Sequence, residues 1–336
     1  SLIGVISFQV LRPQHNQNPV WVGIFLAMEW HLVWFSGSGM ETLLYAFVVT
    51  LILFLLVFLE DQIKVIAFVG ILIGISVWLR PDGITLIGPA FLTVITRPIK
   101  IQKRIQLFLG VIVCLICLFG LYLVFNRLTA DTWWPNTFFA KQAEYAATRK
   151  TSFLLRYLNL LLQPLQGSGI ILLPALLILF WVTLKQQRWN LVAIFIWLFG
   201  YLGLYAWRLP VTYQHGRYVF PIMPLFFILG FVGLDKCVWK ETRSRRDWVL
   251  KTGVNMTLVL VTLGSWVLGA RTYGYDVYYI ESEMVETARW LKKHTPEDSL
   301  IAVHDIGAIG YYSNLRLLDI AGLFSPDIIP IMRVEA

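Results

Sequence analysis

The chain has 336 residues, of which 57% are hydrophobic and only 14% are charged. Because soluble domains carry about 25% charged residues, this composition excludes an ordinary soluble protein and predicts one that lies in a lipid bilayer. The formal net charge of +8 is concentrated in short stretches between apolar segments. That is the pattern of cytoplasmic loops, so we expect no nucleic acid as a partner.

The chain opens on a short apolar stretch, Leu2–Leu11. This stretch is shorter than the roughly 20 residues that cross a bilayer, and no basic segment precedes it as one would in a signal peptide. We therefore expect it to be the end of a truncated helix, with a first span and a first outer loop missing upstream of Ser1.

Apolar segments of spanning or nearly spanning length recur as far as residue 270. They predict an all-α polytopic membrane domain over residues 1–270, with about ten membrane segments when the partial first one is included. The others are expected at Val20–Phe35, Thr42–Leu59, Ile63–Leu79, Ile84–Thr96, Ile105–Phe125, Ile170–Leu184, Trp189–Trp207, Tyr218–Trp239 and Trp248–Ala270.

Basic residues between the spans predict the orientation, because cytoplasmic loops are rich in Lys and Arg. The segments expected on the cytoplasmic side are Arg12–Asn18, Glu60–Asp61, Arg97–Arg104, Lys185–Arg188 and Lys236–Lys251. Alternation then places the segment 127–166 and the C-terminus on the outer side. The prediction is a multi-pass protein of the cell (inner) membrane with an extracytoplasmic C-terminus.

From residue 271 the composition becomes more polar and predicts a small extracytoplasmic α/β domain over residues 271–336. Ile280–His294 has helical spacing of its apolar residues. Leu300–Val303 and Leu315–Asp319 are short apolar runs that predict strands. At about 65 residues such a unit is marginal alone, so we expect it to lean on the membrane domain.

Five motifs follow one another along the chain and fall on the outer side in this topology. They are Ser38-Gly-Met-Glu41-Thr42, Arg80-Pro-Asp82-Gly83, Trp134-Pro-Asn136-Thr-Phe-Phe-Ala-Lys141, His215-Gly-Arg217-Tyr-Val-Phe-Pro221, and Asp305-Ile-Gly-Ala-Ile-Gly-Tyr-Tyr-Ser followed by Leu318-Asp319 and Gly322-Leu. In this order the series resembles bacterial polytopic glycosyltransferases of the GT-C fold, close to the arabinofuranosyltransferase and protein-mannosyltransferase-like groups. The resemblance covers nearly the whole chain.

The resemblance implies an integral membrane hexosyl- or pentosyltransferase. Such an enzyme moves a sugar from a polyprenyl-phosphate carrier to a glycan, lipid or protein acceptor on the extracytoplasmic face. Members of the fold use a carboxylate in the first outer loop, and here that residue is expected upstream of Ser1, which leaves the activity of this piece alone open. The residues indicate no metal site, and a requirement for a divalent metal stays open.

Transfer from a lipid phosphate needs cations or donors that stabilise the departing phosphate. We assign that role to Arg217, His215, Arg80 and Lys141. Arg217 offers a rigid fork of donors at the expected outer end of a span, and its alternative role is snorkelling towards lipid headgroups. For His215 the alternative is a solvated imidazole at the interface.

The transfer also needs a carboxylate that takes the proton of the acceptor hydroxyl, and the candidates are Glu41 and Asp82. The alternative for each is a helix-capping acid, and for Asp82 also a local ion pair with Arg80. The sugar and acceptor side is expected to be lined by Asn136, Trp134 and Tyr213. For Trp134 the alternative is anchoring of an interfacial helix.

Two other features favour structural roles. Cys114 and Cys117 form a C-x-x-C pattern inside an apolar helix, where we interpret them as buried small hydrophobic residues. Asp305 and Asp319 follow short apolar strands, and we interpret them as strand-end turn residues.

Two rival functions remain. A transporter or lipid flippase would carry ionisable residues near the middle of its spans. Glu29 and His31 are such a pair, for which a functional role and a structural contact are equally compatible. The other rival is a non-catalytic membrane fragment, which would have no acidic residue just after its first span.

Overall fold

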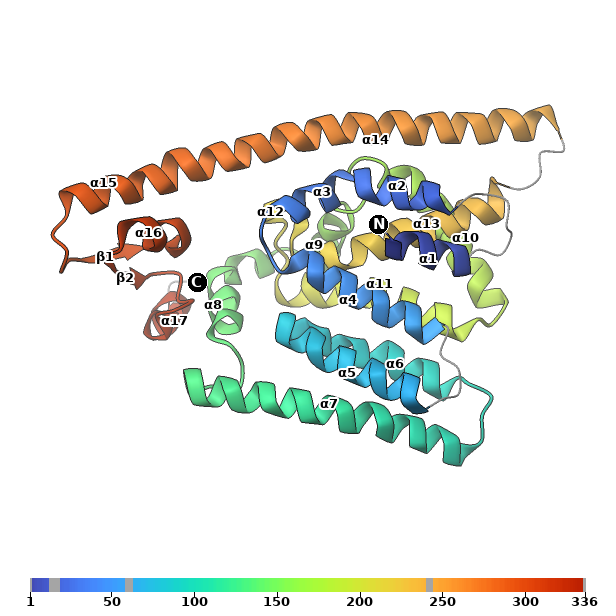
Figure 1. The fold of residues 1–336 in the computed structure, drawn as a ribbon, viewed down its shortest axis with the longest axis horizontal. Coiled ribbons are helices and arrows are strands. Elements are labelled where there is room, and N and C mark those ends of the chain that lie inside the picture. Colours follow the sequence, from blue (N-terminus) through green and yellow to red (C-terminus); the bar gives the residue numbers. More distant parts are fainter. Residues whose placement is uncertain (1, 12–18, 58–62, 240–243, 335–336) are drawn as a thin grey trace.

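The computed structural model describes residues 2–11, 19–57, 63–239 and 244–334, and this part of the chain is almost wholly helical (Figure 1). The turns expected at residues 12–18 and 60–61, and part of the basic segment at 240–243, lie outside it. The prediction of an α-helical protein with long apolar helices is confirmed.

The helices of the first half begin and end close to the predicted spans. They are α1 (Leu2–Leu11), α2 (Val20–Met28), α3 (Trp30–Gly37), α4 (Thr42–Val57), α5 (Ile63–Leu79), the 3-10 helix η1 (Pro81–Leu86), α6 (Ile87–Ile95) and α7 (Ile101–Ala130). The segment 127–166, expected to be one outer connection, forms the end of α7, then α8 (Asn136–Glu144), η2 (Ala146–Lys150) and α9 (Phe153–Leu161).

The second half returns to long apolar helices and ends in the small α/β piece. It consists of α10 (Gly169–Lys185), α11 (Trp189–Arg208), α12 (Tyr213–Gly216), η3 (Phe220–Ile222), α13 (Met223–Cys237), α14 (Arg245–Tyr279), η4 (Ile280–Val285), α15 (Glu286–His294), β1 (Leu300–Val303), α16 (Ile306–Ser313), β2 (Arg316–Asp319), η5 (Pro326–Ile328) and α17 (Ile329–Val334).

Among the described residues, four helices are long and apolar enough to cross a membrane, and the bent pair α2–α3 makes a fifth if it is one span. They are Ile101–Ala130, Trp189–Arg208, Tyr213–Cys237 and Arg245–His294. Four shorter apolar helices accompany them: α4, α5, the pair η1–α6, and α10. The prediction of several membrane-crossing helices is thus supported by length and composition.

Helix α13 lies at the centre of the bundle, and every residue from Met223 to Asp235 is buried. Gly230 and Gly233 face α10, where a side chain would meet Leu172 and the backbone of Ala175. Small residues let membrane helices approach closely, so these glycines bring α10 against α13. By contrast α7 and α14 lie at the edge of the bundle (Figure 1), and few of their residues are buried.

The span predicted at residues 20–35 differs from the structure, because it breaks at Glu29 into two helices that bend by 59°. Glu29 adopts an extended conformation, and its carboxylate accepts hydrogen bonds from the backbone N–H groups of His31 and Leu32 at the start of α3. The same carboxylate contacts His31 Nδ1 at 2.8 Å. An acidic cap therefore starts a new helix inside the apolar stretch.

The boundary predicted between residues 270 and 271 falls inside a continuous helix. Helices α14, η4 and α15 form one rod of 50 residues from Arg245 to His294. At 1.5 Å per residue its length is about 75 Å, more than twice the roughly 30 Å of bilayer hydrocarbon. The rod crosses the whole top of the view in Figure 1 and carries the α/β piece at its far end.

In the α/β piece the two predicted strands are confirmed. Strand β1 pairs in parallel with β2, with Leu300 opposite Arg316 and Val303 opposite Asp319. Asp319 ends its strand and its carboxylate accepts hydrogen bonds from the backbone of Ala321 and Phe324, as expected of a turn residue. The piece leans on the rest of the protein through α8, whose Ala140 and Ala143 pack against Ile329 of α17.

The two ends of the helix bundle differ in chemistry (Figure 1). The turns with the basic residues 97–104 and 185–188 lie at one end, on the right of the view. Helices α8 and α12, the end of α5 and the α/β piece lie at the other. Four of the five motifs singled out in the sequence therefore begin at the same end of the bundle, and the fifth lies beyond it.

Candidate functional site

Arg80 and Asp82 are presented by a tight fold-back at the end of α5. Arg80 is extended, with φ −153° and ψ 133°, and Pro81 starts the 3-10 helix η1. Gly83 donates its N–H to the carbonyl of Arg80 and packs directly on Ser76, where a side chain would collide. The fold-back therefore needs glycine at this position, and it turns both charged side chains towards α11.

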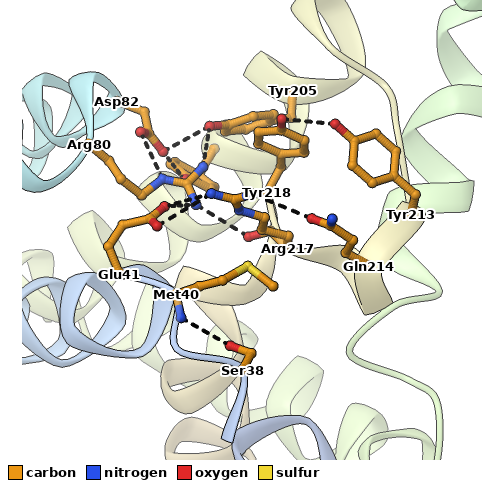
Figure 2. A network of polar contacts seen from close by, with 11 residues as sticks. Ser38, Met40, Glu41, Arg80, Asp82, Tyr205, Tyr213, Gln214, Arg217 and Tyr218 are labelled. Atoms are coloured by element: carbon orange, nitrogen blue, oxygen red, sulfur yellow. Dashed lines mark hydrogen bonds and ion pairs between the residues drawn. The ribbon is translucent and has the colours of Figure 1, made fainter. Parts of the chain in front are cut away.

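Arg80 is buried and makes contacts on every side (Figure 2). Its guanidinium donates to Asp82 Oδ1 at 3.3 Å, to the hydroxyl of Tyr205 at 3.1 Å and to the carbonyl of Arg217 at 3.4 Å. The rings of Tyr45 and Tyr218 lie 5.4 and 5.5 Å away, within cation–π range. Buried charges need such partners, so Arg80 holds several helices together.

Both carboxylate oxygens of Asp82 are engaged by neighbouring side chains. Its Oδ2 accepts hydrogen bonds from both Tyr201 and Tyr205 of α11, the latter at 2.9 Å, while Oδ1 pairs with Arg80. The side chain is only 12% exposed. The predicted local ion pair of Asp82 with Arg80 is therefore present, and the carboxylate is placed to orient Arg80 rather than to receive a proton from a substrate.

Glu41 and Arg217 form the more open half of the site (Figure 2). Arg217 Nη2 donates to both oxygens of Glu41, at 3.1 and 3.3 Å, and Arg80 Nη1 lies 4.0 Å from Glu41 Oε1. The side chains of Arg217 and Glu41 are 30% and 36% exposed, so a ligand has access to both. Arg217 Nε is buried without a hydrogen-bond partner.

Together these four side chains form what we call the charge network: Glu41, Arg80, Asp82 and Arg217. They come from the turn before α4, the α5–η1 turn and the segment after α12, so three distant parts of the sequence meet. Two guanidinium groups balance two carboxylates. Two neighbouring guanidinium groups can bind a phosphate through several hydrogen bonds, and an adjacent accessible carboxylate can accept a proton as a general base.

An apolar groove of about 290 Å³ begins beside the charge network. Its walls are α11 and the face of η1 and α6, and its lining consists of Thr85, Gly88, Pro89, Leu92, Ala193, Ile196, Trp197, Gly200, Tyr201 and Leu204. Tyr201 belongs to both features, because it lines the groove and donates to Asp82. Gly88 and Gly200 face open space, where a side chain would meet no protein atom within 4 Å.

His215 does not join Arg217 as expected. Its Nε2 lies 2.8 Å from Oδ2 of Asp276 on α14, and its ring packs edge-to-face on Trp34. Gln214 and His215 both have left-handed backbone conformations, with φ 51° and 54°. This backbone turns the two side chains to different partners: His215 to α14 and Arg217 to Glu41.

The remaining predicted residues lie further out. Tyr213 is linked to the charge network through Tyr218: its hydroxyl contacts that of Tyr218 at 3.0 Å, and the Tyr218 ring lies beside Arg80. Lys141 pairs with Glu144 at 2.8 Å, and its amine lies 5.4 Å from the centre of the Tyr145 ring. Burial and a hydrogen bond to Glu144 raise the pKa of Tyr145.

Asn136 and Trp134 do not reach the charge network in the described contacts. Asn136 is the first residue of α8, and Trp134 packs against Phe119 of α7 and Phe138 of α8, with ring centres 6.1 and 5.9 Å away. These contacts place the Trp134 ring against α7 and α8 rather than at the charge network, and its alternative role as the anchor of an interfacial helix stays a prediction.

Sequence reasoning missed Tyr201, Tyr205 and Asp276. The two tyrosines stand four residues apart in an otherwise apolar helix, which puts both hydroxyls on one helical face; that spacing was the available signal. Asp276 gave none, because it lies past the point where the membrane domain was expected to end.

Within the described part of the chain, no group of three or more His, Cys, Asp or Glu side chains is arranged to hold a metal ion. Cys114 and Cys117 are free thiols, but the expectation that both are buried is wrong: Cys114 is half-buried and Cys117 is exposed on the outer face of α7.

Comparison with known proteins adds one finding. Residues 275–335 match a family described as a domain of unknown function (DUF8728). No curated protein and no solved structure matches the chain. The matched segment begins on α14 next to Asp276 and contains the whole α/β piece.

Proposed function

We propose that this protein is an integral membrane glycosyltransferase that moves a sugar from a polyprenyl-phosphate carrier to a glycan, lipid or protein acceptor. The observation that carries the proposal is the meeting of the charge network with the apolar groove at Tyr201. A carrier of this type has a phosphate head and a long hydrocarbon tail. The charge network is complementary to the phosphate, and the apolar groove is complementary to the tail.

In this proposal Arg217 receives the carrier phosphate. It is the more exposed of the two arginines. A guanidinium binds phosphate through two parallel hydrogen bonds, so the incoming phosphate competes with Glu41 for Arg217. Arg80 stays fixed by Asp82 and Tyr205 and supplies a second positive charge nearby.

Release of Glu41 from Arg217 gives the site its proton acceptor. The acceptor hydroxyl then gives its proton to Glu41, and its oxygen forms a bond to the anomeric carbon of the sugar. The bond from that carbon to the phosphate oxygen breaks, and its electron pair leaves on the phosphate, where Arg217 stabilises the charge.

The proposal includes the topology expected from the sequence, with about ten membrane segments, the site and the C-terminus on the extracytoplasmic side of the cell (inner) membrane. The segregation of basic residues 97–104 and 185–188 to the end of the bundle opposite α8 and α12 supports this orientation (Figure 1). Transfer from lipid-borne donors, rather than soluble nucleotide sugars, follows from that placement.

The test fills the groove without disturbing the protein. Gly200→Leu and Gly88→Leu place a side chain into the groove, and Gly120→Leu on α7 is the matched control, since it also faces open space on an apolar helix. Purified protein in lipid nanodiscs is incubated with a panel of polyprenyl-phospho-sugars and candidate acceptors, and the release of carrier phosphate is measured.

A leucine side chain fills the room of about three or four methylene groups of the carrier, and the burial of each such group contributes about 0.8 kcal/mol to binding. The groove variants are therefore expected to raise the KM for a long-chain donor by tenfold or more and to affect a short-chain donor much less. The control is expected to behave as the wild type. Arg217→Gln is expected to lose turnover with both donors. If the wild type consumes no donor, or Gly200→Leu and Gly120→Leu behave alike, the proposal is wrong.

One observation favours a transporter or lipid flippase as the second candidate. Glu29 and His31 are buried at the break between α2 and α3, and His31 Nε2 has no hydrogen-bond partner. Broken helices with ionisable residues are typical of transporter sites. In proteoliposomes a flippase would move an unmodified polyprenyl lipid from one leaflet of the bilayer to the other, and Glu29→Gln would abolish that movement. A transferase would leave the distribution of the lipid between leaflets unchanged and would convert the donor.

A further inference from the structure

The segment that leads into Arg217 has an unusual backbone. Gln214, His215 and Gly216 have φ values of 51°, 54° and 75°, so three consecutive residues are left-handed. Only glycine adopts this region without strain, and strained residues persist only where their surroundings hold them. Something outside the turn must therefore fix the direction in which the chain enters Arg217.

The described contacts identify what holds it. Oδ2 of Asp276 lies 2.8 Å from His215 Nε2 and also accepts a hydrogen bond of 2.8 Å from Trp34 Nε1. The imidazole is enclosed further by the rings of Trp34 and Trp30, with centres 4.7 and 5.6 Å away. We call this cluster of Asp276, His215, Trp34 and Trp30 the clasp.

The clasp connects to the charge network through the backbone. Two residues after His215, Arg217 donates to Glu41 through its side chain and accepts a hydrogen bond from Arg80 through its carbonyl. A change in the turn therefore moves both a side-chain donor and a backbone acceptor of the network. Asp276 contributes this control from α14, 59 residues further along the chain than Arg217, and from inside the segment that matches the family of unknown function.

We propose that Asp276 is a positioning residue: through His215 it sets the left-handed turn that directs Arg217 towards Glu41 and towards the carrier phosphate. This gives the C-terminal matched segment a part in the membrane site. The second half of the statement rests on the proposed function, whereas the first half concerns the geometry of the turn alone. The two halves are tested by separate measurements.

The geometry is tested by cross-linking. The three native cysteines are replaced by serine, and Glu41→Cys and Arg217→Cys are introduced, so that the rate of disulfide formation under mild oxidation reports how the turn faces α4. Asp276→Ala is expected to slow the cross-link at least fivefold, and His215→Ala to slow it alike, with no further loss in the double variant. Glu281→Gln is the control, because Glu281 lies on the same rod but pairs with Arg289.

The role in the site is tested with the native Glu41 and Arg217 in place. Asp276→Ala is expected to lower kcat/KM for the donor at least fivefold, because the misplaced Arg217 binds the phosphate less well and also stabilises less of its charge as the bond breaks. Asp276→Asn keeps an amide oxygen that accepts a hydrogen bond from Trp34 or His215. Its kcat/KM is therefore expected to lie between those of the wild type and Asp276→Ala. Thermal unfolding within a few degrees of the wild type shows that the variants are folded.

The outcomes separate the two proposals. An unchanged cross-linking rate in Asp276→Ala overturns the positioning role, whatever the turnover. A slowed cross-link with an unchanged kcat/KM for the donor overturns the link between the turn and the donor site. A slowed cross-link in a protein whose wild type consumes no donor supports the positioning of Arg217 and overturns the glycosyltransferase instead.

Discussion

Replacing Arg80 by methionine is the most severe test of the charge network. Methionine keeps most of the volume but removes the cation that Asp82 and Glu41 share. Removing one partner of a buried ion pair costs about 3–5 kcal/mol. Asp82 would keep its hydrogen bonds from Tyr201 and Tyr205, so we expect the lower end, about 3 kcal/mol.

The loss is measured as the shift of the thermal unfolding midpoint in detergent. For proteins of more than 150 residues each kcal/mol shifts the midpoint by about 2–4 °C, and at the lower end of that range Arg80→Met is expected to unfold about 6 °C below the wild type. Arg208→Met is the control. Its exposed guanidinium lies over Trp207 and Phe138 at the end of α11, and its loss is expected to change stability by about 0.5 kcal/mol or less.

A double variant separates the charge from the packing. Asp82→Leu also removes a buried charge, and Arg80→Met with Asp82→Leu removes the pair together, so the double variant is expected to be more stable than the sum of the single losses by about 1–3 kcal/mol. Strictly additive losses, or a midpoint for Arg80→Met equal to that of Arg208→Met, would show that the two charges do not depend on each other.

Two further predictions concern the packing of α10 on α13 and the turn after β2. Gly233→Val is expected to destabilise the bundle by about 1–3 kcal/mol, because its side chain would overlap Ala175 of α10. Gly253→Val, which faces open space on α14, is the control and should unfold as the wild type does. Equal unfolding midpoints for the two variants would contradict the close approach of α10 and α13. Asp319→Ala removes the acceptor for two backbone N–H groups. Limited proteolysis is therefore expected to cut the C-terminal piece faster while the long helices stay intact. An unchanged cleavage rate would show that the turn does not depend on Asp319.

The sequence predicted helices well because long apolar runs have few alternatives. The span at residues 63–79 has the predicted bounds, and β1 begins and ends as expected. The prediction was wrong at Glu29, where hydropathy averaged over a window concealed a single carboxylate that starts a new helix. It also missed that residues 245–294 form one rod, because the polar residues after 270 resemble a domain boundary in composition alone.

The candidate site was predicted in part. Glu41, Arg80, Asp82 and Arg217 come together from three distant segments, as the ordered motifs led us to expect. The local pair of Arg80 with Asp82 was expected, whereas the pair of Arg217 with Glu41 was not foreseeable, because it depends on how distant segments pack. His215 was grouped with Arg217 on account of its position two residues away, and left-handed backbone angles, which sequence alone does not reveal at a non-glycine residue, send it to Asp276 instead.

Element η4 (Ile280–Val285), within the long rod, is a turn of π-helix, and this has a geometric consequence. A π-turn accommodates one extra residue in a helix, and one residue corresponds to about 100° of rotation around an α-helix. Before η4 the rod presents Asp276 to the bundle, and after it Ala288 faces inward. Inserting or deleting a single residue between these two positions would rotate the α/β piece by about 100° around the rod and break its contact with α8, so the number of residues in this part of the rod matters more than their identity.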